Sequence, residues 1–150
     1  MQVHFICRGN VYRSLIAEAY LNSLRITNLK AISSGIVAKE HSKLNIPVLR
    51  FTLNYLNKKD LGKYTKTHWD QLTQNRLSNK DINICMNQIV YNECSDRIVL
   101  PNNTIIWDID DTDETENIPK TNEELLDYTE KLFTQIKSNI DRLINQQILD

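Results

Sequence analysis

The stretch "VHFICRGNVYRSLIAEAY" (residues 3–20) decides the fold, because an apolar run ends there at Cys-Arg-Gly-Asn and a helical pattern follows. Residues 2–6 are short, apolar and rich in β-formers, so they are predicted to form a strand. From Arg13 onward, apolar side chains recur at helical spacing, as at Ile16 and Tyr20. The sequence therefore places a cysteine and two arginines where a strand turns into a helix.

The rest of the chain alternates further strands with helices. A helix is predicted from Pro47, and a long one after Thr121, whose hydroxyl forms a capping box with Glu124. Strand-like segments occur at residues 29–35, 80–86, 96–100 and 103–109, of which 96–100 is the shortest and weakest. This order predicts an α/β fold of three layers, with a central parallel sheet of about four strands flanked by helices. Residues 1–150 are expected to form a single domain.

The composition is that of a globular protein, with 41% apolar and 25% charged residues. The formal net charge of −1 gives no general attraction to nucleic acid or to an anionic membrane. No stretch is long and apolar enough to span a bilayer, and the opening "MQVHFIC" lacks the pattern of a signal peptide. We therefore expect a cytoplasmic protein without nucleic-acid or membrane partners.

The three cysteines, Cys7, Cys85 and Cys94, do not suggest a disulfide framework, because in a reducing compartment they stay thiols. Their spacing, without nearby pairs of histidines, does not suggest a zinc site either. The chain is expected to need no metal ion and no organic cofactor.

The turn after the first strand has the residues of an anion-binding loop. Backbone N–H groups that point inward from such a loop, next to a helix N-terminus, bind an anion. Gly9 permits a close backbone approach, and Asn10 tolerates a left-handed conformation. Arg13 offers a planar fork for two phosphate oxygens, and Ser14 can donate a hydrogen bond to sulfur. The same positive field favours the thiolate of Cys7, so the pattern predicts a nucleophile at the floor of an oxyanion cradle.

The stretch "VHFICRGNVYRSLIAEAYL" resembles the N-terminus of the low-molecular-weight protein tyrosine phosphatase family, which combines a strand with Cys-x-Gly-Asn-x-x-Arg-Ser and Ala-Glu-Ala. Later segments of the chain resemble the same family along nearly its whole length. The positions that match the first motif are Cys7, Gly9, Asn10, Arg13, Ser14, Ala17, Glu18 and Ala19. The later segments are "ISSG" (32–35), "HWDQLTQNRL" (68–77), "DINICM" (81–86) and "IIWDIDD" (105–111).

The resemblance implies a cysteine-dependent protein-tyrosine phosphatase that acts on a phosphotyrosine protein or an aryl phosphate, with a cognate tyrosine kinase as its counterpart. It implies that Cys7 attacks phosphorus, that Arg13 holds the phosphoryl oxygens and that Ser14 stabilises the departing thiolate. It also implies that Asn10 shapes the loop and bonds Ser34. The phosphate-binding residues carried over from the family are Arg8, Gly9, Asn10, Val11, Tyr12, Arg13 and Ser14.

The resemblance also implies a general acid on a late loop, because an alkoxide or phenolate leaves poorly without a proton. Alignment on Trp107 assigns that role to Asp111. Asp110 is the rival, since the family's aspartate normally precedes a proline and Thr112 stands at that place.

Several positions depart from the family and keep other interpretations open. Tyr12 replaces a second loop cysteine, and the segment "IVAKEHSK" (36–43) lacks the aromatic residue common in relatives. Arg8 either adds charge at the mouth of the loop or points to solvent, and His68 is either a shifted family histidine or a surface residue.

Two other functions compete with the phosphatase. The same scaffold hosts thiol-dependent arsenate reductases, in which Cys85 and Cys94 would relay a disulfide. The alternative to that relay is that Cys85 is a core residue of its strand. The second competitor is a catalytically impaired member that binds phosphate or phosphoprotein without turnover.

Overall fold

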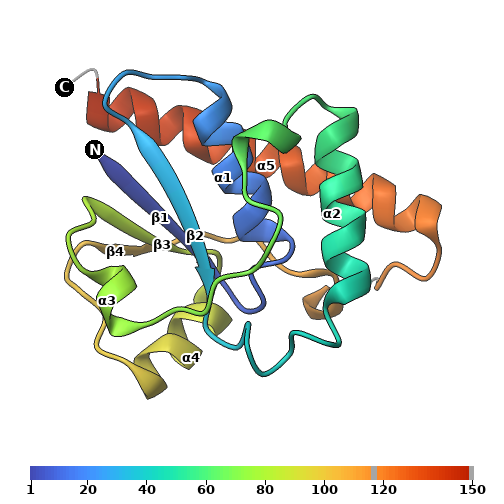
Figure 1. The fold of residues 1–150 in the computed structure, drawn as a ribbon, viewed down its shortest axis with the longest axis horizontal. Coiled ribbons are helices and arrows are strands. Elements are labelled where there is room, and N and C mark those ends of the chain that lie inside the picture. Colours follow the sequence, from blue (N-terminus) through green and yellow to red (C-terminus); the bar gives the residue numbers. More distant parts are fainter. Residues whose placement is uncertain (116–117, 149–150) are drawn as a thin grey trace. The chain divides into compact units, whose positions relative to one another are not determined.

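The computed structural model describes residues 1–115 and 118–148, and strands and helices alternate along it (Figure 1). The chain divides into two compact units, Met1–Asp108 and a second that begins at Ile109. No helix within the described residues is both long and apolar enough to cross a membrane. The elements are β1 (Gln2–Cys7), α1 (Arg13–Ser23), β2 (Lys30–Gly35), α2 (Ile46–Lys58), η1 (Gly62–Tyr64), α3 (Gln74–Leu77), β3 (Ile82–Cys85), α4 (Gln88–Arg97), β4 (Thr104–Ile106), η2 (Thr112–Glu114) and α5 (Asn122–Ile148).

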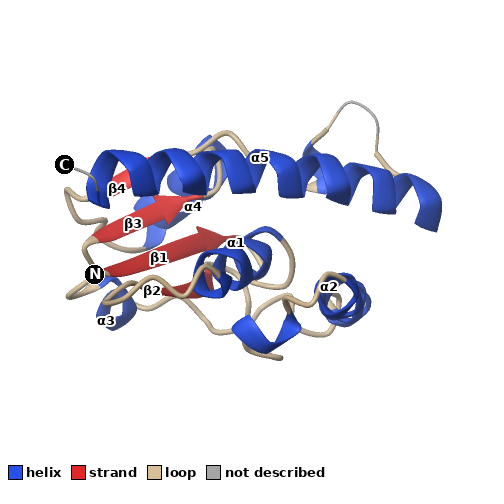
Figure 2. Cartoon of the chain, turned by 90° about the horizontal axis from the view of Figure 1, so that it is seen from above, coloured by secondary structure: helices blue, strands red, loops and turns tan. Residues whose placement is uncertain are grey.

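The first unit contains a four-stranded sheet in the order β2-β1-β3-β4, and every pair in it is parallel. Figure 2 shows β1 and β3 as neighbouring arrows that point the same way. The predicted α/β fold with a central parallel sheet flanked by helices is therefore confirmed. Cys7 pairs with Gly35, and Ile6 pairs with Cys85, so β1, β2 and β3 end at the same edge of the sheet. Ligands of parallel sheets bind beyond that edge.

Helices cover both faces of the sheet in this unit, with α1 on one side of the strands and α3 and α4 on the other (Figure 1). Ile6 and Phe5 point to opposite faces because successive side chains of a strand alternate. Both are fully buried. The cluster on the Ile6 side consists of Ile6, Ile36, Val37, Leu72, Leu77, Cys85, Val90 and Cys94.

The buried polar residue His4 interrupts the apolar pattern of β1. The ring of His4 has Nδ1 3.0 Å from Asn83 Oδ1 and Nε2 2.8 Å from Ser34 Oγ. Burial lowers the pKa of His4 to about 3, although the hydrogen bond with Asn83 opposes the shift. The ring is therefore neutral, and a neutral ring that donates from Nδ1 accepts the Ser34 hydroxyl proton at Nε2.

One predicted strand was wrong. Asp96 and Arg97 of the segment 96–100 end α4, whose N-cap is Asn87. The apolar residues that suggested a strand, Ile98 and Leu100, pack from a loop against the Ile6-side cluster. Ile98 and Leu100 are apolar because they pack on the core, without a strand partner. The fourth strand is β4, which is shorter than the predicted segment 103–109.

The second unit contains η2 and the long helix α5. The N-terminal cap of α5 is confirmed in part, because Thr121 Oγ1 accepts a hydrogen bond from Glu124 N at 3.1 Å. The carboxylate of Glu124 accepts from Lys120 N at 2.7 Å, so the box closes one residue earlier than predicted.

Candidate active site

The loop between β1 and α1 wraps around the sulfur of Cys7. Asn10 adopts the left-handed conformation that its type tolerates, with φ of 57°. This turn aims the Asn10 backbone N–H at Cys7 Sγ, 3.2 Å away. The carbonyls of Cys7 and Arg8 accept hydrogen bonds from Ile36 N and Val37 N, at 3.1 and 2.9 Å, so they point to the segment after β2. The loop thus turns an N–H group toward the sulfur and carbonyl groups away from it.

A second donor reaches the same sulfur from the first turn of α1. Ser14 Oγ lies 2.9 Å from Cys7 Sγ and accepts a hydrogen bond from Asn10 Nδ2 at 2.7 Å. Because the hydroxyl oxygen already accepts from Asn10, its proton is available to the sulfur. Cys7 and Ser14 are both buried. Two hydrogen-bond donors thus converge on the sulfur of this buried cysteine.

Arg13 occupies the first position of α1 and is only 1% exposed. The N-terminus of a helix carries partial positive charge, so the loop, the helix end and the guanidinium together favour an anion next to Cys7. Val11 and Tyr12 are also buried, and Thr52 of α2 donates a hydrogen bond to Val11 O at 2.6 Å. The loop is therefore held from α2 as well as from the sheet.

Gly35 is a residue whose importance for this loop the sequence did not reveal. A Cβ at Gly35 would lie 2.6 Å from Arg8 O and 2.8 Å from Asn10 N, which are backbone atoms that cannot rotate away. A Cβ at Gly9 would meet the side-chain amide of Asn45 at 2.5 Å, and that flexible group can move. The close approach between the end of β2 and the backbone of the loop thus depends on Gly35 more than on Gly9.

The expected hydrogen bond between Asn10 and Ser34 is not made, and this prediction was wrong. Asn10 Oδ1 accepts instead from the backbone N–H of Asp70, at 2.8 Å. Ser34 Oγ accepts from Arg76 Nε at 2.6 Å and lies 2.8 Å from His4 Nε2. Ser34 therefore belongs to a neighbouring polar cluster, and Asp70 takes the place at Asn10 that was assigned to Ser34.

The side chain of Arg8 forms an ion pair with α4, a contact that neither alternative for Arg8 included. Arg8 Nε donates to Glu93 Oε1 at 2.7 Å. His68 is a surface residue, with 65% of its side chain exposed and Nε2 3.6 Å from Asp70 Oδ1.

The two aspartates considered for the acid role lie in the second unit. Asp111 is the N-cap of η2, where its carboxylate accepts from Thr112 N at 2.7 Å. Glu114 closes the capping box by accepting from Asp111 N at 3.0 Å. Asp110 is exposed, and its backbone carbonyl accepts from Tyr128 Oη at 2.6 Å. Hydrogen bonds of the loop thus orient the carboxylate of Asp111.

Cys85 and Cys94 are core residues of the Ile6-side cluster, and both are fully buried. The hydrogen bond with Cys85 and burial raise the pKa of Cys94 far above its usual range. A thiol relay requires accessible thiolates, so this arrangement disfavours the reductase interpretation. No cluster of His, Cys, Asp or Glu in residues 1–115 and 118–148 is arranged to hold a metal ion.

A comparison with protein families gives one match along most of the chain. The model of the family described as "Low molecular weight phosphotyrosine protein phosphatase" matches residues 2–146. No curated protein matches the chain in sequence.

Solved structures share the fold at low sequence identity. A low molecular weight protein tyrosine phosphatase from T. tengcongensis is 20% identical with a TM-score of 0.76, covering 97% of this chain and 99% of that one. The YwlE arginine phosphatase from Geobacillus stearothermophilus is 20% identical with a TM-score of 0.65, covering 98% and 95%. A Drosophila arginine phosphatase is 15% identical with a TM-score of 0.68, covering 97% of each chain.

Proposed function

Because the chain belongs to the low molecular weight phosphotyrosine protein phosphatase family, we propose that it hydrolyses phosphate monoesters through a phosphorylated cysteine at Cys7. The observation that supports this best is the pair of hydrogen bonds that converge on Cys7 Sγ, from Ser14 and from the Asn10 backbone. A buried thiol with two donors and a helix N-terminus beside it is suited to attack at phosphorus.

The proposed reaction has two steps. In the first, the thiolate of Cys7 attacks phosphorus, the sulfur–phosphorus bond forms and the ester oxygen leaves with a proton from Asp111. In the second, the carboxylate of Asp111 takes a proton from water, whose oxygen attacks phosphorus, and Cys7 departs as a thiolate. Arg13 and the loop N–H groups neutralise the phosphoryl oxygens in both steps, and Ser14 stabilises the departing sulfur.

Aryl phosphates and phosphotyrosine proteins are the substrate class that we propose first. A second candidate is phosphoarginine, because the structural neighbours include proteins described as arginine phosphatases. The segment 36–43 contains no aromatic residue, so a flat phenyl ring would lack a stacking partner from this part of the chain. The proposal includes a single catalytic domain, a cytoplasmic location and a cognate kinase that supplies the phosphorylated protein.

The proposal is tested by hydrolysis of p-nitrophenyl phosphate between pH 5 and 8, with EDTA in one series and with vanadate, without EDTA, in another. We expect turnover that vanadate inhibits and that needs no added metal, because the protein supplies the positive charge. A phosphotyrosine peptide and a phosphoarginine peptide of the same sequence, compared by kcat/KM, then separate the two substrate candidates. A folded, reduced protein that turns over none of these substrates would contradict the proposal, and arsenate reduction and phosphopeptide binding would be measured next.

The role of Asp111 is tested by replacing each aspartate of the pair. We expect Asp111→Asn to slow p-nitrophenyl phosphate hydrolysis by roughly a hundredfold, the usual scale for a lost general acid, and Asp110→Asn to change it little. With 2,4-dinitrophenyl phosphate, whose leaving group needs no proton, the deficit of Asp111→Asn should shrink in the first step. If Asp110→Asn is the crippled variant, the alignment that assigns the acid is off by one residue.

A further inference from the structure

A chain of hydrogen bonds leads from Asp70 to the sulfur of Cys7. The backbone N–H of Asp70 donates to Asn10 Oδ1 at 2.8 Å, and Asn10 Nδ2 donates to Ser14 Oγ at 2.7 Å. Ser14 Oγ in turn lies 2.9 Å from Cys7 Sγ. Each group accepts from the one before and donates to the next, so the donors all point toward the sulfur. Hydrogen bonds in such a series strengthen one another.

The backbone N–H of Asp70 sets the direction in which these hydrogen bonds donate. A backbone N–H can only donate, so it selects the orientation of Asn10 that places the side-chain oxygen against it. With the amide of Asn10 reversed, the oxygen would face Ser14 and take the hydroxyl proton. Ser14 would then have no proton left for the sulfur. The position of one backbone N–H outside the loop thus controls whether Ser14 donates to Cys7.

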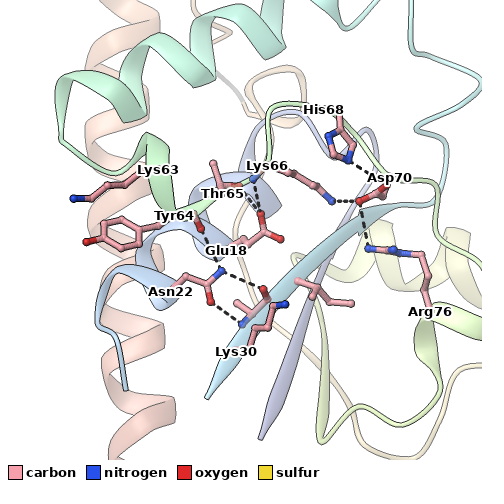
Figure 3. Close-up of a pocket in the computed structure, with 12 residues that line it drawn as sticks. Glu18, Asn22, Lys30, Lys63, Tyr64, Thr65, Lys66, His68, Asp70 and Arg76 are labelled. Carbon is pink, nitrogen blue, oxygen red and sulfur yellow. Dashed lines mark hydrogen bonds and ion pairs between the residues drawn. The ribbon is translucent and has the colours of Figure 1, made fainter. Parts of the chain in front are cut away.

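The side chain of Asp70 is held by three basic residues (Figure 3). Asp70 Oδ2 lies 2.7 Å from Lys66 Nζ and 3.5 Å from Arg76 Nη2, and Oδ1 lies 3.6 Å from His68 Nε2. Lys66 and Arg76 also donate to Ser33 O in β2, at 2.6 and 3.0 Å. The carboxylate therefore binds two cations that are themselves attached to the sheet.

The segment that carries Asp70 is anchored at further points. Asp70 O accepts from Gly35 N at 2.9 Å, at the end of β2. Glu18 of α1, only 5% exposed, accepts from the Thr65 hydroxyl and from Lys66 N. Glu18, Thr65, Lys66 and Asp70 are among the residues that line a pocket of about 590 Å³, which Figure 3 shows. The anchors fix the segment to β2, which neighbours β1 in the sheet, and to α1, the helix that follows the phosphate-binding loop.

The charges of the cluster favour its ionised form. Burial works against the carboxylate of Asp70, but the hydrogen bond from Lys66 and the charges of Lys66 and Arg76 outweigh it and lower the pKa of Asp70. The lowered pKa keeps Asp70 ionised in more acidic solution than an ordinary carboxyl group, so the carboxylate stays charged at pH 6 as well as at neutral pH.

We propose that Asp70, clamped by Lys66 and Arg76, is a positioning residue that orients Asn10 so that Ser14 donates its hydroxyl proton to Cys7. Asp70 touches neither substrate nor the reacting atoms in this role and acts through Asn10 and Ser14. The proposal rests on the proposed function only for its catalytic consequence, because the donation to sulfur exists without substrate.

The test measures alkylation of Cys7 by iodoacetamide in Asp70→Asn, at pH 6 and at pH 10, by peptide mass. Asparagine keeps the size of the side chain and removes the charge that binds Lys66 and Arg76. We expect alkylation about tenfold slower than in wild type at pH 6, the effect of losing one ordinary hydrogen bond. At pH 10 the rates should converge for two reasons. Hydroxide then forms the thiolate without help from Ser14. Burial also lowers the pKa of Lys66, so the wild type itself loses charge on this partner of Asp70. Lys66→Met should show the same pattern.

Lys63→Gln is the matched control, because Lys63 lines the same pocket and has no part in the chain to Cys7. Its alkylation should match that of wild type at both pH values. Thermal unfolding of each variant shows whether it is folded, and Lys66→Met replaces Asp70→Asn if the latter is not.

Two results would overturn the proposal. Alkylation equal to wild type at pH 6 in a folded variant would show that Asp70 does not influence the sulfur. A rate that is reduced equally at pH 6 and pH 10 would show that the substitution changes the access of iodoacetamide to Cys7 and not the hydrogen bond from Ser14 to its sulfur.

The same variant has an expected effect on turnover. With p-nitrophenyl phosphate, the kcat of Asp70→Asn should fall about tenfold with little change in KM. A wild-type protein without any turnover would contradict the proposed function and leave the alkylation result valid.

Discussion

Cys7→Ser is expected to abolish turnover, with a loss of more than about 10⁴-fold in kcat. The serine hydroxyl is not ionised near neutral pH, so the two donors that point at this position have no anion to stabilise. The variant should still bind phosphate, because the loop N–H groups and Arg13 are unchanged. Hydrolysis of p-nitrophenyl phosphate and calorimetric titration with phosphate measure the two properties separately.

Cys94→Ala is the control for this variant, because Cys94 is a cysteine of the same unit and lies in the core. It is expected to lose some stability through the cavity that it leaves and to keep its turnover. Turnover that survives in Cys7→Ser, or that disappears equally in Cys94→Ala, would contradict the role of Cys7 as the nucleophile.

Arg13→Lys is expected to reduce kcat/KM by about 10³-fold even though it keeps the positive charge. A guanidinium binds two phosphoryl oxygens at once in a fixed plane, and an ammonium group cannot. The site is buried, so water cannot replace the missing contact. The loss should appear mainly in kcat, because the contact is strongest when charge builds up on the phosphoryl oxygens.

Arg97→Lys provides the comparison, because Arg97 forms an exposed ion pair with Glu40 at the end of α4. Its kcat/KM should equal that of wild type, since exposed pairs contribute little and the residue takes no part in the loop. If Arg13→Lys also kept its activity, the guanidinium would not be a ligand of the phosphoryl group.

The phosphate-binding loop could be predicted because its parts lie close together in the sequence. Cys7, Asn10 and Ser14 are separated by a single turn, so residue type and spacing alone indicate how they meet. The strand before the loop and the helix after it have clear periodicities, and both formed as expected.

The partners that come from distant segments could not be predicted in the same way. Asn10 was expected to bond Ser34, but the backbone amide of Asp70 occupies its oxygen. A backbone group leaves no trace in residue type, so no sequence pattern indicates that bond. The polar residue His4, which stands between apolar neighbours in β1, is a usable signal for the buried cluster with Ser34, because such a residue needs a partner.

The spacing of apolar residues also led to a wrong strand prediction for residues 96–100, where these residues pack on the core from a loop. Ile98 and Leu100 are partly buried in a loop. Apolar residues at every second position have the same sequence pattern in a loop that packs on the core as in a strand. Likewise, the spacing of Cys85 and Cys94 allowed a thiol relay, and only their complete burial shows them as core residues. The acid role of Asp111 stays a prediction, because its hydrogen bonds describe the loop that carries it and not the reaction.

The most direct test of the account is to look for phosphate on Cys7 itself. Wild-type protein is mixed with p-nitrophenyl phosphate, quenched in acid within milliseconds, digested and analysed by mass spectrometry. We predict a phosphorylated peptide that contains Cys7, and no phosphorylated form of the corresponding peptide in Cys7→Ala. Turnover by the wild type without any phosphate on Cys7, at times that precede the steady state, would contradict it.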